Sequence, residues 1–287
     1  MSIFSGGLLK ELKFILKQNN IKPKKRLGQS FVVCQNLISS MIKAADIRNT
    51  DVVLEVGAGL GFLTRELAKK AKRVIAIEID GKLIRILEKN LEKYGNVDII
   101  HGDALKFKFD NAIDKIVSNL PFNISSQFTF KLVDFKFKYA ILTLQREFVN
   151  RMMANPNSKD YGRLTVTSQF FFKIELLHHV PRKCFYPIPE VDASLVKLTP
   201  LRTSPLSNVD AFFLDIIKFL FSQKNKKLKN VLRNYFELND VSNKKMILLD
   251  KIPFLERRII ELGVDELYKI ALSIYPHLKS FHNRMIT

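Results

Sequence analysis

The tetrapeptide Asn119-Leu120-Pro121-Phe122 places an amide, a rigid turn and an aromatic ring side by side. The Asn119 side-chain oxygen and a nearby backbone carbonyl, that of Leu120, can accept the two hydrogens of an exocyclic base amine. Pro121 stiffens the turn and adds no competing N–H, and Phe122 offers a face for stacking a flipped base. In isolation the pattern is more typical of an Asn-Pro turn beside a core phenylalanine.

The glycine-rich segment Gly57-Ala58-Gly59-Leu60-Gly61 lies between an apolar run and a helical pattern. Glycines let the backbone turn sharply and approach a ligand closely. The dinucleotide pattern requires a small residue at position 62, where this chain has Phe62. This spacing favours a ligand without a pyrophosphate over NAD.

Two acidic residues follow at the ends of expected strands. Glu78 lies 21 positions after Gly57, where a carboxylate can accept both hydroxyls of a ribose. Asp103 ends the next strand and can accept from the exocyclic amine of a cofactor's adenine. Alternatively, Glu78 is a surface carboxylate and Asp103 a helix cap. Their order after the glycines favours a site for a nucleoside-containing cofactor.

Short β-branched runs alternate with helical patterns from residue 51 onward, which predicts a mostly parallel sheet covered on both faces. Ligands of such sheets bind at the carboxyl ends of the strands. We expect strands at 52–56, 73–78, 97–101, 113–118 and 139–145, and helices at 62–71 and 82–93.

The segment 199–205 is rich in Pro, Ser and Thr and predicts a linker, after which the pattern becomes helical. We expect helices at 211–222, 226–234, 254–262 and 264–274. The expected organisation is an N-terminal extension (1–22), an α/β domain (23–202) and a small all-α domain (203–287). Leu8, Leu12 and Ile15 have helical spacing, typical of an amphipathic helix packed on the main domain, with a targeting peptide or membrane-surface helix as the alternative.

The chain is strongly basic, with 47 Lys and Arg against 28 Asp and Glu and a net charge of +19. Such an excess attracts polyanions, of which nucleic acid is the usual one. Two clusters fit an RNA partner, with solvated surface as the alternative. They comprise Lys24, Lys25 and Arg26, and Lys224, Lys226, Lys227 and Lys229, the latter expected within one helical stretch.

Cysteine and histidine usage predicts neither a disulfide nor a metal site. Cys34 and Cys184 are far apart and outside any C-x-x-C, so we expect two reduced, small apolar residues. His178 and His179 are adjacent and cannot converge on one ion. No apolar run is long enough to cross a bilayer, and a cytoplasmic monomer is the default expectation.

With these residues, the chain resembles the KsgA-type ribosomal RNA adenine dimethyltransferases, most closely their archaeal or eukaryote-like branch. The likeness runs from about residue 22 to the C-terminus, and its motifs occur in order. It implies a Rossmann-like S-adenosylmethionine-dependent methyltransferase domain followed by a small helical domain. The matching segments are Lys24-Lys25-Arg26-Leu27-Gly28-Gln29-Ser30-Phe31, the glycine loop, the tetrapeptide, Phe185-Tyr186-Pro187-Ile188-Pro189-Glu190-Val191-Asp192 and the basic stretch 221–230.

The resemblance also implies residue roles. Gln29, Ser30, Phe31 and Val32 would line the methionine and ribose end of S-adenosylmethionine, with Gly57 and Gly59 as its glycine loop. Glu78 would bind the ribose, Asp103 the adenine, and Asn119 both cofactor and target. Phe185 would help to hold the target base. Two departures are Ser30, where bacterial members commonly have Asn, and Phe122, where Tyr is commoner.

The family substrate is a pair of neighbouring adenosines in the 3′-terminal hairpin of small-subunit ribosomal RNA, each methylated twice. Three other functions remain open. They are an RNA-binding assembly factor without catalysis, a large-subunit RNA methyltransferase that confers antibiotic resistance, and a nicotinamide-dependent oxidoreductase, which Phe62 disfavours.

Overall fold

The computed structural model describes residues 7–108, 113–202, 205–238, 249 and 251–277. Its contacts divide the chain into two units. The first unit comprises the chain up to Val149 together with Phe172–Ser204, and the second comprises Asn150–Phe171 together with the chain from Pro205. Residues 203 and 204 of the expected linker lie outside the described residues.

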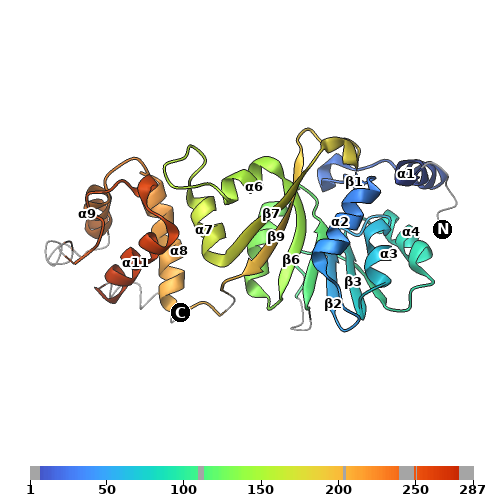
Figure 1. Cartoon of the computed structure of the whole chain (residues 1–287), viewed down its shortest axis with the longest axis horizontal. Helices are drawn as coiled ribbons and strands as arrows, with labels where there is room; N and C mark the ends of the chain where they lie inside the picture. Colours follow the sequence, from blue (N-terminus) through green and yellow to red (C-terminus); the bar gives the residue numbers. More distant parts are fainter. Residues whose placement is uncertain (1–6, 109–112, 203–204, 239–248, 250, 278–287) are drawn as a thin grey trace. The chain divides into compact units, whose positions relative to one another are not determined.

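The first unit is built on a seven-stranded sheet in the order β4-β3-β2-β5-β6-β9-β7 (Figure 1). The strands β4, β3, β2, β5 and β6 are parallel to one another, whereas β9 is antiparallel to both β6 and β7. The predicted α/β class and mostly parallel sheet are confirmed; β7 and β9 were not predicted. The strands are β2 (Val52–Val56), β3 (Arg73–Glu78), β4 (Val97–His101), β5 (Lys115–Asn119), β6 (Tyr139–Gln145), β7 (Phe172–Val180) and β9 (Ala193–Pro200).

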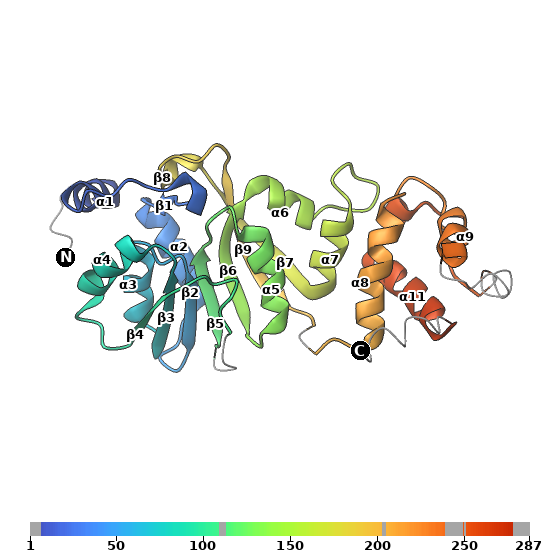
Figure 2. The same ribbon diagram turned by 180° about the vertical axis from the view of Figure 1, so that it is seen from behind.

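Helices cover both faces of this sheet. In Figure 1 α2 lies over one face, and Figure 2 shows α5 over the other. The helix α2 forms because Leu37, Ile38, Met41 and Ala45 recur at helical spacing and bury one stripe. The helices are α2 (Gln35–Ala45), α3 (Phe62–Ala68), α4 (Gly81–Leu91), α5 (Ser125–Lys131) and α6 (Arg146–Met152), with short 3₁₀ turns η1 (Lys25–Leu27), η2 (Leu132–Asp134) and η3 (Arg182–Cys184).

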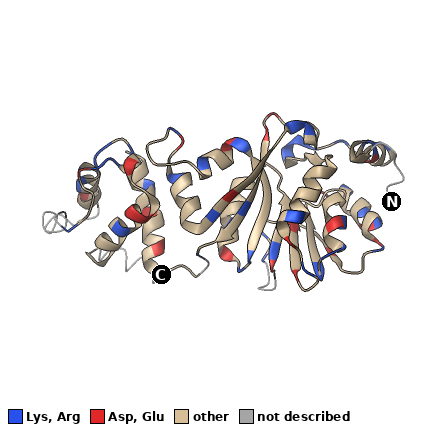
Figure 3. Ribbon diagram, in the orientation of Figure 1, with Lys and Arg blue, Asp and Glu red and all other residues tan. Residues whose placement is uncertain are grey.

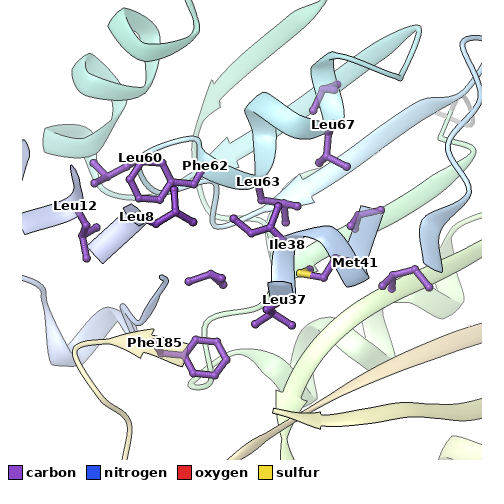
Figure 4. Packing of buried hydrophobic residues seen from close by; sticks show 14 of the residues in the cluster. Leu8, Leu12, Leu37, Ile38, Met41, Leu60, Phe62, Leu63, Leu67 and Phe185 are labelled. Carbon is purple, nitrogen blue, oxygen red and sulfur yellow. The ribbon is translucent and has the colours of Figure 1, made fainter. Parts of the chain in front are cut away.

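The N-terminal helix α1 (Gly7–Gln18) packs on the first unit, as the spacing of its leucines predicted. Figure 4 shows Leu8 and Leu12 beside Leu60 and Phe62, which belong to the glycine segment and the start of α3. The same face carries Glu11, whose carboxylate pairs with the Arg65 guanidinium at 3.3 Å. No helix in the described part of the chain is long and apolar enough to cross a membrane.

Two very short strands, β1 (Phe31–Val32) and β8 (Phe185–Tyr186), pair antiparallel, with Phe31 opposite Tyr186. This pairing brings Cys34 and Cys184 together as a disulfide with a Cα–Cα distance of 4.9 Å. The prediction of two unpaired cysteines was therefore wrong. The partners are 150 residues apart in sequence, and two-residue strands leave no pattern from which their pairing can be predicted.

The second unit is mainly helical around an aromatic core. The rings of Phe170 and Phe213 lie 4.5 Å apart between centroids, and Tyr268 packs against both. A reciprocal cap between Ser207 and Asp210 begins α8. The elements are α7 (Arg163–Phe171), α8 (Asn208–Phe221), α9 (Leu228–Leu238), α11 (Val264–Ile274) and the 3₁₀ turns η5 (Ile259–Glu261) and η6 (Tyr275–His277).

The helix predicted at 254–262 does not form. Its backbone pairs instead with the segment before α9, where Leu228 N donates to Arg257 O at 2.9 Å and Ile260 N donates to Lys224 O at 2.9 Å. Because α9 begins only at Leu228, most of the second basic cluster precedes this helix, contrary to the expectation of one helical stretch.

The packing of α1 predicts a selective loss of stability. Leu12 is fully buried and Leu9 is 37% exposed on the same helix. We expect Leu12→Ala to lower the free energy of unfolding by about 2–5 kcal/mol and Leu9→Ala to change it little. Urea titrations followed by circular dichroism would measure both, and equal effects would contradict the observed packing of α1.

Candidate active site

A cavity opens at the carboxyl ends of the parallel strands, where the glycine segment turns from β2 into α3. Gly57 and Gly59 have φ angles of +76° and +59°, a region that side chains rarely adopt. A Cβ on Gly57 would lie 3.0 Å from the Pro121 ring, and one on Gly59 would lie 3.1 Å from the Phe31 ring. These glycines therefore let two other segments of the site approach the turn closely.

Glu78 ends β3 inside this cavity and is only 5% exposed. Its Oε2 accepts from the Gly59 amide at 2.9 Å, and its Oε1 accepts from the Asp80 amide at 2.8 Å. Burial raises the pKa of Glu78 above its ordinary value, although these backbone hydrogen bonds oppose the shift. Each oxygen retains a lone pair, so the carboxylate can still accept from a pair of hydroxyls.

Asp103 does not cap a helix, because the chain forms only a turn after β4. Its Oδ1 accepts from the Leu105 amide at 2.9 Å and closes the turn after β4. The residue also lines the cavity, and no hydrogen-bond partner of Oδ2 lies among the described residues. One carboxylate oxygen thus shapes the turn while the other can accept from a ligand.

Glu55 is a cavity residue that the sequence reasoning missed. It lies in β2, is 2% exposed, and its Oε2 is buried without a hydrogen-bond partner in the described structure. Burial raises its pKa to about 8. An acidic residue within the apolar run 52–56 was the available signal. A buried acceptor beside a glycine turn fits a ligand that carries a cation or a strong donor.

The Asn119 side chain is held at two points at the cavity wall. Its Nδ2 donates to the Ser30 carbonyl at 2.9 Å. Because a carbonyl can only accept, this contact places the amide nitrogen on the Ser30 side. The Thr143 hydroxyl donates to Asn119 Oδ1 from the adjacent strand, where the two residues are in register. Oδ1 has a second lone pair and can accept from one further donor.

Thr143 was also missed, because its role depends on the register between β5 and β6. Its hydroxyl is fully buried, and no local motif marks it. Ser30 connects the same site to the segment after β8, since its hydroxyl donates to the Pro187 carbonyl at 2.9 Å.

The predicted site residues fall into two groups in the structure. The cavity is lined by Pro121 and by every residue predicted for the cofactor, namely Gln29, Ser30, Phe31, Val32, Gly57, Gly59, Glu78, Asp103 and Asn119. Leu120, Phe122 and Phe185 lie outside its lining. Phe122 and Phe185 meet edge to face, with ring centroids 6.2 Å apart, and Phe185 is 1% exposed.

The first basic cluster contains two kinds of residue. Lys25 and Arg26 are exposed, and Lys25 forms a solvent-exposed ion pair with Glu190 at 3.1 Å. The Lys24 ammonium instead pairs with the nearly buried Asp80 carboxylate at 2.7 Å. Lys25 and Arg26 can therefore reach phosphates freely, whereas Lys24 is already bound within the protein.

The second basic cluster contains an acidic partner that the sequence did not indicate. Glu256 accepts from Lys227 at 2.9 Å and from Lys229 at 2.5 Å. Lys224 donates to the Tyr161 carbonyl at 2.9 Å. Figure 3 shows Lys and Arg distributed along both units with fewer acidic positions among them. The two ion pairs with Glu256 are exposed, so phosphates can compete for Lys227 and Lys229 at little cost.

The site combines a glycine turn, acidic residues at the strand ends, and a fixed amide beside an aromatic pair. Together these features are typical of one class of protein, a methyltransferase that uses a nucleoside cofactor and acts on a base amine. The sequence model of "Ribosomal RNA adenine dimethylase" matches residues 20–252. The chain belongs to this family, and it is an S-adenosylmethionine-dependent ribosomal RNA adenine dimethyltransferase.

Individual relatives agree with this assignment. The chain is 44% identical over 273 residues to a Methanosarcina barkeri protein named "Probable ribosomal RNA small subunit methyltransferase A", covering 94% of this chain and 93% of the relative. A dimethyladenosine transferase from Plasmodium falciparum superposes with a TM-score of 0.78 at 34% identity, covering 86% of this chain and 98% of that one. A 23S rRNA methyltransferase shares the fold, with a TM-score of 0.65 at 22% identity over 85% of this chain and 99% of that one.

The environment of Glu55 predicts a pH dependence of stability. Its pKa rises to about 8 on folding, so the stability contributed by the protonated acid is complete below about pH 4.5 and is lost as the pH rises through 8. We expect Glu55→Gln to be more stable than wild type at pH 8 by a few kcal/mol, with the difference vanishing near pH 4.5. Urea unfolding of the ligand-free proteins would measure this; a pH-independent difference between them would contradict the assignment.

Proposed function

We propose that this enzyme dimethylates the exocyclic amines of two adjacent adenosines in the 3′-terminal hairpin of small-subunit ribosomal RNA. The small-subunit substrate is supported by the name of the Methanosarcina barkeri relative, and the hairpin and the pair of adenosines by the sequence resemblance. The observation that carries the proposal is the Asn119 amide, fixed at the cavity wall with an acceptor lone pair to spare.

The cavity residues fit the parts of S-adenosylmethionine. The two Glu78 oxygens would accept the ribose hydroxyls, and Asp103 Oδ2 would accept from the adenine amine. Glu55, buried and partly unpartnered, suits the ammonium of the methionine moiety. S-adenosylmethionine supplies a methyl group already activated by its positively charged sulfur.

The chain's own task is to present the target amine. The amine lone pair of adenine is delocalised into the ring, which makes the nitrogen a poor nucleophile. Asn119 Oδ1 and the Leu120 carbonyl would accept its two hydrogens, fix the nitrogen and favour its pyramidal form. Phe122, backed edge-on by Phe185, would stack on the flipped base. Alignment of the amine carries most of the rate, so this proposal assigns no residue as a strong general base.

The basic residues would hold the RNA through its phosphates. Lys25 and Arg26 lie next to the cavity-lining residues Leu27, Gly28 and Gln29, close to where the base would enter. The lysines before and within α9, in the second unit, provide a further set of phosphate contacts. Structured RNA is recognised largely through backbone and shape, which such contacts suit.

Loss of the amide tests the proposal. We expect Asn119→Ala to lower kcat for methyl transfer roughly 10²-fold or more, because the amine is no longer held. RNA affinity should stay within about twofold, since the phosphate contacts remain. The exposed Asn36→Ala is the matched control and should keep wild-type activity.

The assay uses labelled methyl groups and small ribosomal subunits that lack the modification, with the acceptor nucleotides mapped. Labelling of two neighbouring adenosines near the 3′ end supports the proposal. Wild-type protein that binds these subunits without methylating them would instead indicate an assembly factor, and labelling only on large-subunit RNA would indicate the resistance-type activity.

RNA affinity should depend strongly on salt. Each phosphate contact releases counterions, so Lys25→Gln and Arg26→Gln should each reduce the log–log salt slope by about one. Lys70→Gln, an exposed control outside both clusters, should leave the slope unchanged. Filter binding over a range of salt concentrations measures the slope, and a wild-type slope near zero would exclude phosphate-driven binding.

A further inference from the structure

Asp80 is a nearly buried carboxylate, 3% exposed, at the N-terminus of α4. Both of its oxygens are bonded by the loop of residues 24–29. Oδ1 accepts from the Lys24 ammonium at 2.7 Å, and Oδ2 accepts from the Gln29 side-chain amide at 2.8 Å. Burial raises the pKa of Asp80, but the hydrogen bonds from Lys24 and Gln29 outweigh it and bring the pKa below its ordinary value.

These contacts exceed what helix capping requires. The cap needs only the bond from the Lys82 amide to Asp80 Oδ1, which is present at 3.2 Å. Lys24 and Gln29 come from a segment more than 50 residues earlier in the sequence. Their contacts connect α4 to this loop, which Asn123 also holds through a hydrogen bond to the Arg26 carbonyl at 3.2 Å.

The attached loop is a wall of the cofactor cavity, since Leu27, Gly28 and Gln29 all line it. Its two ends are joined by a hydrogen bond from the Lys24 amide to Gln29 Oε1 at 2.7 Å. Gly28 has a φ of +62°, and a Cβ there would lie 2.5 Å from Asn123 Oδ1. The loop therefore sits tightly against the segment that follows the tetrapeptide.

Asp80 also contacts the cavity-lining residue Glu78 through its backbone. Its amide donates to Glu78 Oε1 at 2.8 Å, and Glu78 Oε2 accepts from the Gly59 amide at 2.9 Å. One residue thus connects the loop to the carboxylate and the glycine turn that would surround the cofactor's ribose.

We propose that Asp80 is a positioning residue for the cofactor, which with Lys24 and Gln29 forms a latch that holds loop 24–29 against the cavity. The inference rests on the proposed function in that the cavity binds S-adenosylmethionine. It assigns Lys24 to cofactor binding rather than to RNA binding, in contrast to its neighbours Lys25 and Arg26.

The experiment measures the dissociation constant of S-adenosylhomocysteine by calorimetry, at a temperature where circular dichroism shows each variant to be folded. Lys24→Met and Asp80→Asn should each weaken binding roughly tenfold, as expected when a charge-assisted hydrogen bond that holds the bound conformation is lost. Lys24→Arg should restore most of the affinity. The double variant should bind no more weakly than Asp80→Asn alone, because both substitutions remove the Lys24–Asp80 ion pair.

Lys25→Met is the matched control. It removes the same charge from the next residue in the sequence, whose side chain is 94% exposed. It should leave the S-adenosylhomocysteine affinity unchanged and weaken RNA binding. Lys24→Met should weaken S-adenosylhomocysteine binding and leave RNA binding unchanged. In the methylation assay, Lys24→Met should raise KM for S-adenosylmethionine with kcat changed by less than about threefold.

The latch is overturned if Lys24→Met binds S-adenosylhomocysteine within twofold of wild type, or if Lys25→Met weakens that binding equally. Should Asp80→Asn fail to fold, Lys24→Met still decides, because it leaves the α4 cap in place. If the variants show the expected affinities but the wild-type protein methylates no RNA, the proposed function is contradicted and the latch proposal still holds.

Discussion

The Asn119 amide is fixed between the Thr143 hydroxyl and the Ser30 carbonyl, and the geometry of the site depends on these two bonds. The first bond exists because β5 and β6 are in a register that places Asn119 opposite Thr143. The second exists because β1 pairs with β8 and keeps the Ser30 backbone beside the end of β5. A single side chain is thus oriented by the central sheet and by a small separate sheet, and a shift of either would turn its oxygen away from a target amine.

Three acidic residues lie near the carboxyl ends of β2 and β3. They show how different surroundings give the same carboxyl group different roles. Glu55 has a buried oxygen without a partner and a pKa raised to about 8. Glu78 is almost as buried, but two backbone amides hold it, and Asp80 is paired with a lysine that lowers its pKa. In the proposed account, the first receives a cation, the second a ribose, and the third holds the wall of the cavity.

The parts that the sequence predicted are those with local signals. The strands 52–56, 73–78, 97–101 and 139–145 form with the predicted bounds, and the inner strands among them are mostly apolar, as buried parallel strands require. The glycine segment and the acids at strand ends were identifiable because their spacing is set by the turns they occupy. These elements sufficed to predict the α/β fold and part of the cavity lining, including Gly57, Glu78 and Asp103, whereas Glu55 was missed.

The parts that it missed depend on contacts between distant segments. The disulfide between Cys34 and Cys184 follows from strands only two residues long, and Thr143 matters only through its register with Asn119. Residues 254–262 have a helical pattern, yet their backbone forms hydrogen bonds with residues 224–229, a pairing between distant segments that no local pattern indicates. Lys24 looks like its basic neighbours in sequence, and only the position of Asp80 distinguishes it.

A crystal structure with S-adenosylhomocysteine and a short RNA hairpin that carries the target adenosines would test the central claim most directly. The account predicts that the target N6 lies about 3 Å from both Asn119 Oδ1 and the Leu120 carbonyl, with the bonds to Thr143 and Ser30 retained. A flipped adenosine whose N6 is bound elsewhere, with Asn119 Oδ1 still bonded to Thr143 alone, would contradict it.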